Sequence, residues 1–294
     1  MLAAVVAQLE RVNLPIYEAP ARRILTTTSG FIREAGFTHS LTPARNCTFG
    51  CTYCYVPTMG LYGGLKPDDW RRWGQFTTFK QNAPELFRRE LRAGQIIYCS
   101  PLVDPYQPAE AEMLMMPRLL EVLLQGPPVR FVVQTRGALV VRDIELLKAV
   151  GARVSFSLTT DDESVRRLYE PHCDSLEARL QSIARLREAG VVVHATLAPL
   201  LPCDPTTLAR LALDATGRDL VGDPLHVRSV KPRGATTREA AFRIAQLHAG
   251  HERWFDPDFM NEVYCTIASE AAKRGLKFLT GPAGFRLLTL ETQC

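Results

Sequence analysis

Strand-like and helix-like segments alternate along most of this chain of 294 residues, and this alternation limits the folds that it can adopt. Short apolar runs, typical of buried strands, occupy residues 37–41, 95–99, 129–135, 153–158, 191–197 and 225–230. Segments with apolar residues three or four positions apart, typical of helices, lie between them at 83–92, 110–124, 141–150, 175–189 and 205–215. Repeated β-α units imply a parallel sheet, because right-handed crossovers return each strand beside the last.

Residues at the helix ends agree with this interpretation. Asp143, Ser175 and Asp204 stand near the starts of three helical segments, where their side-chain oxygens can accept backbone hydrogen bonds. Gly151 and Gly190 follow two of the helices as caps that lead into the next strand. About six units predict an α/β fold with a parallel sheet, a partial (β/α)6 TIM-type barrel, whose functional groups stand at the C-terminal ends of the strands.

Three regions follow from this pattern. We expect an N-terminal extension at residues 1–36, the partial barrel at 37–230, and a C-terminal extension at 231–294 that packs on the barrel. Residues 62–79 and 231–257 fall outside the pattern, as solvated loops or as elements that cover a site. The C-terminal extension is expected to hold a helix near 261–274 and a strand at 276–279.

Composition excludes few functions. With 46% hydrophobic and 22% charged residues the chain is an ordinary soluble protein, and its net charge of +4 is too small to indicate a partner. No apolar run approaches the roughly 18 residues of a membrane helix, and the N-terminus lacks the features of a signal peptide. We therefore expect a cytoplasmic protein without membrane contact, whose thiols stay reduced.

Three cysteines, Cys47, Cys51 and Cys54, follow the first expected strand with the spacing C-x3-C-x2-C. Three thiolates on one short loop can hold three corners of a 4Fe-4S cluster and leave one iron open for another ligand. A C-x2-C pair alone could also be half of a zinc site, a redox pair or a disulfide. The cluster is favoured because no second pair follows to complete a zinc site, and a redox pair has no use for a third cysteine. Cys173, Cys203 and Cys265 are expected to be small buried hydrophobes.

Several further stretches occur in the order typical of one family. They are Tyr53-Cys54-Tyr55, Asp104-Pro105-Tyr106-Gln107-Pro108, Arg142-Asp143-Ile144-Glu145-Leu146-Leu147, Ser155-Phe156-Ser157, Glu170-Pro171 and Ala198-Pro199. With the cysteine loop, they resemble the radical S-adenosylmethionine superfamily, and within it the spore photoproduct lyase branch, over about residues 37–202. The resemblance implies that S-adenosylmethionine chelates the open iron. A reductant such as flavodoxin or ferredoxin would then supply the electron that splits it to a hydrogen-abstracting 5'-deoxyadenosyl radical.

The resemblance also implies cofactor-binding residues. Arg136, in the place of a lysine, and Ser157 would contact the methionine end of S-adenosylmethionine. Ala198 would lie against the adenine, and Ser100 and Tyr53 complete the expected binding set. The alternatives are a surface arginine at position 136 and simple packing at position 198.

The resemblance suggests catalytic residues as well. Cys99 ends the second strand and is expected to point into the barrel mouth, where its thiol could donate hydrogen to a carbon radical, although it could equally be a small core residue. Tyr53 and Tyr55 could relay a hydrogen atom or an electron, or could form the wall of the pocket.

Three functions fit these residues. The first is repair of a DNA photolesion, for which residues 66–92 offer seven basic residues interleaved with Trp70, Trp73, Phe76 and Phe79 but diluted by four acidic residues. The second is biosynthetic chemistry on a small molecule, including cleavage of a different carbon-sulfur bond of the cofactor. The third is a cluster protein that senses redox state without catalysis.

Overall fold

The computed structural model describes residues 14–63, 69–229, 231 and 235–290, and its centre is a sheet of eight strands. In spatial order they are β11 (Phe278–Thr280), β10 (Leu220–Gly222), β9 (Val192–Leu197), β8 (Arg153–Ser157), β7 (Arg130–Thr135), β6 (Ile96–Cys99), β3 (His39–Leu41) and β2 (Leu25–Thr27). Neighbouring strands are parallel except for β2 and β3. The α/β class and the parallel sheet are confirmed, and among the described residues the sheet stays open between β2 and β11.

The prediction of a sixth strand at residues 225–230 was wrong. Residues 225–229 form no strand, and β10 occupies that position in the sheet, with Val221 paired to Thr196 of β9. Its three residues are all buried, but a run this short has no recognisable period. The strand expected at 276–279 is β11, and it extends the same sheet beyond β10.

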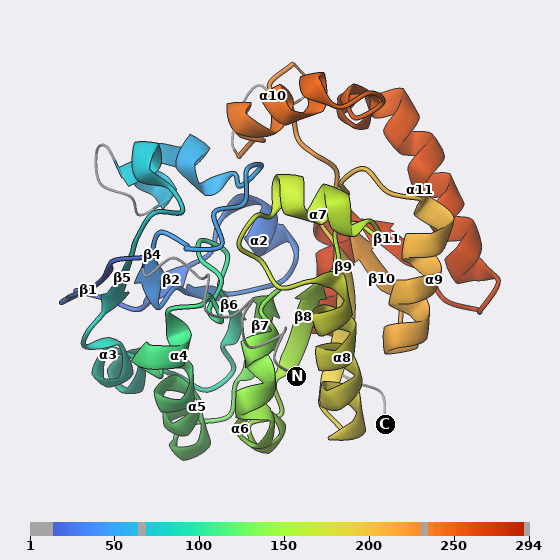
Figure 1. The fold of residues 1–294 in the computed structure, drawn as a ribbon. Coiled ribbons are helices and arrows are strands. Elements are labelled where there is room, and N and C mark those ends of the chain that lie inside the picture. Colours follow the sequence, from blue (N-terminus) through green and yellow to red (C-terminus); the bar gives the residue numbers. More distant parts are fainter. Residues whose placement is uncertain (1–13, 64–68, 230, 232–234, 291–294) are drawn as a thin grey trace, which may run out of the picture.

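Helices cover both faces of the sheet (Figure 1). The outer face, which carries Ile97 and Val133, packs against α3 (Ala83–Glu90), α5 (Met115–Gln125), α6 (Ile144–Ala149), α8 (Leu176–Glu188), α9 (Pro205–Thr216) and α11 (Pro257–Ala272). The remaining helices are α2 (Gly30–Glu34), α4 (Glu110–Met113), α7 (Glu163–Tyr169), α10 (Glu239–Leu247), α12 (Gly281–Arg286) and the 3-10 turns η1 (Val56–Gly63), η2 (Asp69–Arg72), η3 (Ala138–Asp143), η4 (Glu252–Phe255) and η5 (Leu287–Thr289). None of the helices in the described part of the chain combines the length and apolarity needed to cross a membrane.

Most of the expected helix caps are present. Ser175 and Asp204 accept backbone hydrogen bonds at the starts of α8 and α9. Gly151 and Gly190 have φ angles of +62° and +87°, the left-handed conformation that favours glycine after a helix. Asp143 makes no cap hydrogen bond, because its carboxylate pairs with the guanidinium of Arg142.

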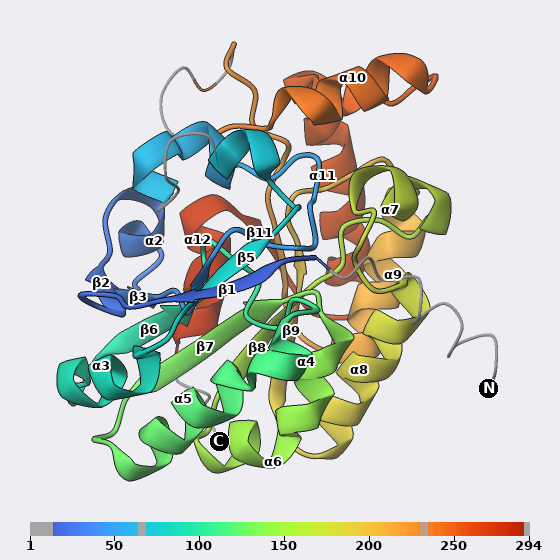
Figure 2. The ribbon, with the colours of Figure 1, turned by 60° about the vertical axis from the view of Figure 1, so that its left-hand side comes forward.

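A second apolar cluster lies on the opposite face of the sheet, here called the inner face. Tyr98, Val132 and Val221 project there from three strands and pack with Phe285 of α12. The ring of Phe285 also meets Phe31 of α2, with centroids 5.2 Å apart. Figure 2 shows α12 across the sheet from α5, α6 and α8. The N-terminal and C-terminal segments therefore close the inner face together.

The cysteine loop leaves a smaller sheet, which consists of β1 (Ile16–Ala19), β5 (Thr77–Lys80) and β4 (Ala44–Arg45) in that order. After β4 the loop crosses the backbone of Gly74, whose φ is +86°. A Cβ atom on Gly74 would lie 2.8 Å from the Cα of Gly50, in the middle of the loop. Only a residue without a side chain allows this approach, so the two glycines fix how the loop lies against its neighbour.

Replacing Gly74 by alanine should therefore destabilise the fold more than replacing a glycine in open space. Gly94→Ala is the matched control, because Gly94 has a φ of +77° and an added methyl group there would have nothing within 4 Å. We expect a loss of roughly 1–2 kcal/mol for Gly94→Ala from backbone strain, and roughly 1–3 kcal/mol more for Gly74→Ala from overpacking. Urea unfolding measures both. Equal losses would show that the backbone contact at Gly50 is unimportant.

Candidate active site at the cysteine loop

The three cysteines lie on one compact loop. Cys47 and Cys51 are buried and Cys54 is half-buried, and the loop closes through hydrogen bonds from the Gly50 N–H to the Cys47 carbonyl (3.1 Å) and from the Cys54 N–H to the Cys51 carbonyl (3.2 Å). Among the described residues, no three Cys, His, Asp or Glu side chains converge on the position of a single metal ion. A cubane does not require such convergence, since each thiolate binds its own iron.

Two segments that follow strands hold this loop in place. Thr48 donates from both its N–H and its hydroxyl to the side-chain oxygen of Gln107, at 2.9 and 3.1 Å. Thr52 donates from its N–H to the carbonyl of Tyr169, at 2.9 Å. Gln107 comes after β6 and Tyr169 after β8, so the loop lies at the C-terminal ends of the parallel strands. The motif Asp104 to Pro108 thus anchors the cysteine loop through Gln107.

A buried carboxylate lies directly behind the loop. Glu170, which has no exposed side-chain surface, forms ion pairs of 2.5 Å with both Arg136 and Arg179. Thr159 donates to the same carboxylate at 2.9 Å, and the hydroxyl of Tyr53 donates to it as well. Burial alone would raise the pKa of Glu170, but the charges of Arg179 and Arg136 hold it at about 2. The carboxylate therefore stays ionised and fixes both guanidinium groups.

Arg136 reaches the cysteine loop. Its Nη1 lies 3.7 Å from the Cys51 sulfur and also donates to the Tyr53 hydroxyl. Its backbone N–H donates to the carboxylate of Asp104 at 2.9 Å, and Asp104 in turn accepts from the hydroxyl of Thr135 at 2.7 Å. Asp104 thus orients the turn that carries Arg136. The role of Arg136 toward a cofactor carboxylate stays a prediction.

The three thiols have different electrostatic surroundings. The Cys173 thiol, which contacts Cys51, lowers the pKa of Cys51 against the opposing effect of burial, and the charge of Arg136 lowers it further. Burial raises the pKa of Cys47 and brings that of Cys54 to about 12. Cys51 is therefore the thiol of the three that ionises most readily.

The inner face of the sheet also carries buried polar atoms without partners. The Ser157 hydroxyl, the Gln134 side-chain oxygen and the His194 Nδ1 are buried and accept or donate no hydrogen bond within the described chain. Gln134 and His194 both pair with Ser155 across neighbouring strands, and Ser157 lies two positions further along. Desolvation lowers the pKa of His194 to about 4, so its ring is neutral at pH 7.

These unpartnered atoms are the structural test of the expected cofactors. A buried polar group without a partner costs free energy, and a bound polar ligand or water removes that cost. Ser157 is fully buried at the C-terminal end of β8, where the resemblance expects a cofactor contact. The three cysteines and this hydroxyl together fit a cluster and S-adenosylmethionine at the C-terminal ends of the strands.

Other expected site residues lie in less open positions. Cys99 is completely buried in the apolar side-chain cluster beneath the outer helices. Its neighbour Tyr98 faces the apolar cluster on the inner face of the sheet. The expectation that Cys99 points into the barrel mouth is therefore not met, because side chains alternate along a strand and position 98 takes the inner face. Ser100 lies near Thr42, with the two hydroxyl oxygens 3.5 Å apart, and Ala198 is half-buried against the inner cluster.

The two tyrosines beside Cys54 differ in exposure. Tyr53 is buried and its hydroxyl is engaged by Glu170 and Arg136. Tyr55 is 36% exposed, and its hydroxyl donates to the carbonyl of Pro101. Tyr55 is thus the more accessible of the two for a relay. Cys265, expected to be buried, is exposed on α11.

The basic stretch at residues 66–92 does not form the expected stacking surface. Trp73, Phe76 and Phe79 are buried in the core. Lys66, Asp68 and the side chain of Trp70 lie outside the described residues. Interleaved aromatic residues predicted a platform for bases, but these rings fill the space beneath β5 instead, which the sequence spacing alone could not distinguish.

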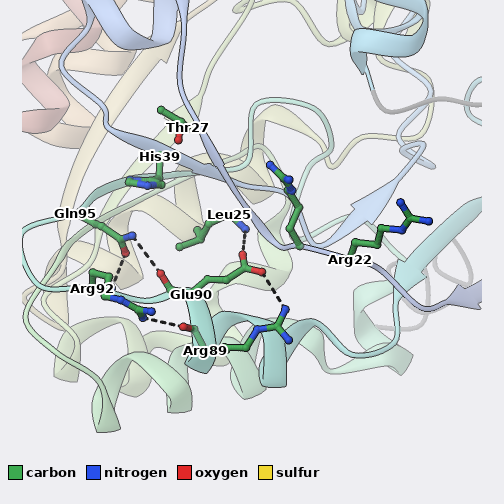
Figure 3. Close-up of a pocket in the computed structure, with 9 residues that line it drawn as sticks. Arg22, Leu25, Thr27, His39, Arg89, Glu90, Arg92 and Gln95 are labelled. Carbon is green, nitrogen blue, oxygen red and sulfur yellow. Dashed lines mark hydrogen bonds and ion pairs between the residues drawn. The ribbon is translucent and has the colours of Figure 1, made fainter.

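Two arginines of this stretch, Arg89 and Arg92, line a cavity of about 560 Å³ together with Arg22. Figure 3 shows these side chains. Glu90 at its centre accepts hydrogen bonds from the backbone of residues 24 and 25, so one acidic group faces several basic ones. The lining also includes His39, at the start of β3, so the cavity opens toward the opposite end of that strand from the cysteine loop.

The C-terminal third also contributes to the site. The Arg238 guanidinium lies 3.5 Å from the Cys51 carbonyl, and its backbone N–H donates to the Tyr53 carbonyl at 3.4 Å. Sequence reasoning missed Arg238, together with Glu170 and Arg179 as an ion-paired group. Of the three, only Glu170 could have been found from the sequence, because Glu170-Pro171 is one of the stretches that carry the family resemblance. Contacts between distant segments leave no local sequence pattern.

Comparison with known proteins agrees with this geometry. The model of the family described as "Radical SAM superfamily" matches residues 41–204, more than half of the chain. Over 157 residues the chain is 26% identical to an uncharacterized protein of Methanocaldococcus jannaschii, covering 53% of this chain and 58% of that protein. Over 178 residues it is 29% identical to an uncharacterized protein of Mycobacterium tuberculosis, covering 56% of this chain and 50% of that one. The chain thus matches about half to three-fifths of the length of these relatives.

A solved structure extends the likeness to most of the fold. A mutant of spore photoproduct lyase with bound AdoMet and dinucleoside spore photoproduct superposes with a TM-score of 0.61 at 14% sequence identity. The superposition covers 90% of this chain and 81% of that one. At this identity the likeness concerns the fold.

Removing the buried charge should test the role of Glu170. Glu170→Gln leaves Arg136 and Arg179 without a counter-charge, and we expect a loss of roughly 3–5 kcal/mol in the free energy of unfolding. The exposed pair of Glu239 and Arg243 provides the control, because Glu239→Gln should cost less than about 1 kcal/mol. Urea unfolding at pH 7 distinguishes the two, and similar small losses would contradict the assignment.

The pH dependence has a definite sign. Because the folded-state pKa of Glu170 lies below its ordinary value of 4.5, its contribution is complete above about pH 4.5 and is lost as the pH falls toward 2. The wild-type protein should therefore lose more stability over this interval than Glu170→Gln does, as urea unfolding at a series of pH values would measure.

Proposed function

Because the chain belongs to the radical S-adenosylmethionine superfamily, we propose that it is an enzyme that reductively cleaves S-adenosylmethionine for hydrogen abstraction. Its cofactors are a 4Fe-4S cluster and S-adenosylmethionine. When bound, they convert one electron from a reductant, such as flavodoxin or ferredoxin, into a 5'-deoxyadenosyl radical. The observation that carries the proposal is the three-cysteine loop at the C-terminal ends of the strands, together with the unpartnered hydroxyl of Ser157 at the end of β8.

The chain's own residues would bind and orient the two cofactors and shield the radical from water. Cys47, Cys51 and Cys54 would hold the cluster. Ser157 would hydrogen-bond the methionine end of the cofactor, Ala198 would lie against the adenine, and Ser100 and Tyr53 would complete the binding set. Arg136, fixed by Glu170, supplies positive charge beside Cys51 and suits a carboxylate. Burial of the loop excludes water and stray hydrogen donors from a radical.

The favoured substrate class is a DNA photolesion, processed as in spore photoproduct lyase. The likeness of the fold to that enzyme over most of the chain supports it. The arginine-lined cavity, at the opposite end of β3 from the cysteine loop, offers a separate surface for phosphate groups outside the lesion. Extruding the damaged nucleotide from the duplex costs a few kcal/mol of lost base stacking, and damage to the base reduces this cost.

A specific observation favours a second candidate, a small-molecule substrate. The aromatic residues Trp73, Phe76 and Phe79 are buried, so they offer no stacking platform for bases. The net charge of +4 also gives little general attraction for a polyanion.

Ser157 offers a test of the cofactor site. In the reconstituted protein, Ser157→Ala should raise the dissociation constant of S-adenosylmethionine by roughly 2- to 12-fold, the equivalent of one hydrogen bond of about 0.5–1.5 kcal/mol. Ser155→Ala is the matched control, because its hydroxyl already pairs with Thr196 at 2.5 Å. Isothermal titration calorimetry measures both. An equal or larger effect at Ser155 would count against the site.

The reaction and the substrate can be tested together. Protein reconstituted without air with iron and sulfide, then reduced with S-adenosylmethionine, should release 5'-deoxyadenosine, and Cys47→Ala should release none. On an oligonucleotide that carries a thymine photoproduct, we expect the lesion to be reversed. Release of 5'-deoxyadenosine with an unprocessed lesion would remove the repair hypothesis and leave the small substrate. A different fragment of the cofactor would indicate cleavage of another carbon-sulfur bond.

Two controls sharpen this experiment. The first concerns the salt dependence of oligonucleotide binding. In the double variant Arg22→Ala/Arg89→Ala, the slope of log Kd for the oligonucleotide against log salt concentration should fall by about 1 for each phosphate that the arginines no longer neutralise. Arg118→Ala, on α5, should leave this slope unchanged. Because Cys99 is buried toward the outer helices, Cys99→Ala should leave both cofactor cleavage and repair intact, and a block in repair alone would show that its thiol donates hydrogen.

A further inference from the structure

A fourth thiol lies against the cysteine loop. The sulfur of Cys173 is 3.6 Å from the sulfur of Cys51, and both residues are buried, with 7% and 8% of their surface exposed. Cys173 lies outside the three-cysteine motif, 122 positions along the chain from Cys51. Neither the motif nor the cofactor site accounts for a thiol at this distance from a cluster ligand.

The backbone around Cys173 is held firmly in this position. Arg166 donates to the carbonyls of Cys173 and Glu170, at 2.9 and 2.8 Å. The N–H of Cys173 donates to the Glu170 carbonyl at 3.1 Å. On the other side, Thr52 is tied to Tyr169 through both its N–H and its hydroxyl. The segment that carries Cys173 is therefore held by its own hydrogen bonds and is tied to the cysteine loop through Thr52.

We propose that Cys51 and Cys173 form a reversible disulfide when the loop holds no cluster, so that oxidation closes the site to iron. The sulfur atoms need to approach only from 3.6 Å to about 2 Å. Cys51 ligated to iron cannot make this bond. The disulfide thus marks the empty protein, and reduction by a thiol reopens the loop for cluster assembly.

The oxidation is balanced with hydrogen peroxide as the oxidant. The Cys51 thiolate attacks one peroxide oxygen, which gives a sulfenic acid and hydroxide. The Cys173 sulfur then attacks the sulfenic sulfur, the S–S bond forms, and the hydroxyl group leaves as water after taking up the thiol proton. In total two S–H bonds are oxidised to one S–S bond, and peroxide is reduced to two molecules of water.

The test begins with full-length protein whose iron has been removed by a chelator without air. After brief treatment with hydrogen peroxide, free thiols are alkylated and the digest is analysed by mass spectrometry. We expect a crosslinked peptide that joins Cys51 to Cys173 as the main disulfide, while the exposed Cys265 reports general oxidation. A main crosslink from Cys51 to Cys47 or Cys54, or oxidation of Cys265 without any crosslink at Cys51, would overturn the proposal.

Uptake of iron gives an independent readout. Oxidised wild-type protein should bind less than about a tenth of the iron that reduced protein binds, and dithiothreitol should restore the difference. In Cys173→Ser the same peroxide dose should instead drive Cys51 to sulfinic acid, which dithiothreitol does not reverse. Cys203→Ser, which removes a half-buried thiol elsewhere, should behave as wild type. Full recovery of Cys173→Ser would contradict the protective role.

The proposal uses Cys51 as a cluster ligand, and so rests on the proposed function, but does not depend on the substrate or on turnover. The crosslink is measured on empty protein, so it reports on Cys173 even if no cleavage of S-adenosylmethionine is detected.

Discussion

The charge of Glu170 is the interaction on which the arrangement of the site depends. A carboxylate without contact with water is tolerated only when paired and hydrogen-bonded. Its partners come from four separate parts of the chain: Arg136 after β7, Arg179 on α8, Thr159 after β8 and Tyr53 on the cysteine loop. Satisfying one charge therefore brings these segments together, and the loop that carries the cysteines takes its position from them.

The two faces of the sheet differ in the side chains that they carry. On the outer face, side chains such as Ile97, Val133 and Phe156 pack against helices and leave no polar group to satisfy. On the inner face, Ser157 and Gln134 present buried polar atoms without partners within the described chain. Packing of α12 and α2 against Tyr98, Val132 and Val221 closes part of that face.

The direction of side chains explains two departures from expectation. Cys99 was expected in the barrel mouth because it ends β6, yet Tyr98 occupies the inner face and Cys99 the outer one. The aromatic residues from Trp73 to Phe79 were expected to stack on bases, yet they fill the core beneath a strand. In both cases residue type and spacing gave the chemistry of the side chain but not where it points. The direction of the side chain depends on the register of pairing, which spacing does not specify.

The sequence by itself determined the fold class, the order of the first five parallel strands, the long outer helices and the three-cysteine loop. These features depend on local periodicity, on glycine conformation and on the spacing of ligands along a few residues. Only the tertiary structure decided the short strand β10, the ion pairs of Glu170 and the contact between Cys51 and Cys173. Such contacts join segments tens of residues apart, and their energies come from burial and charge compensation, which no local pattern encodes.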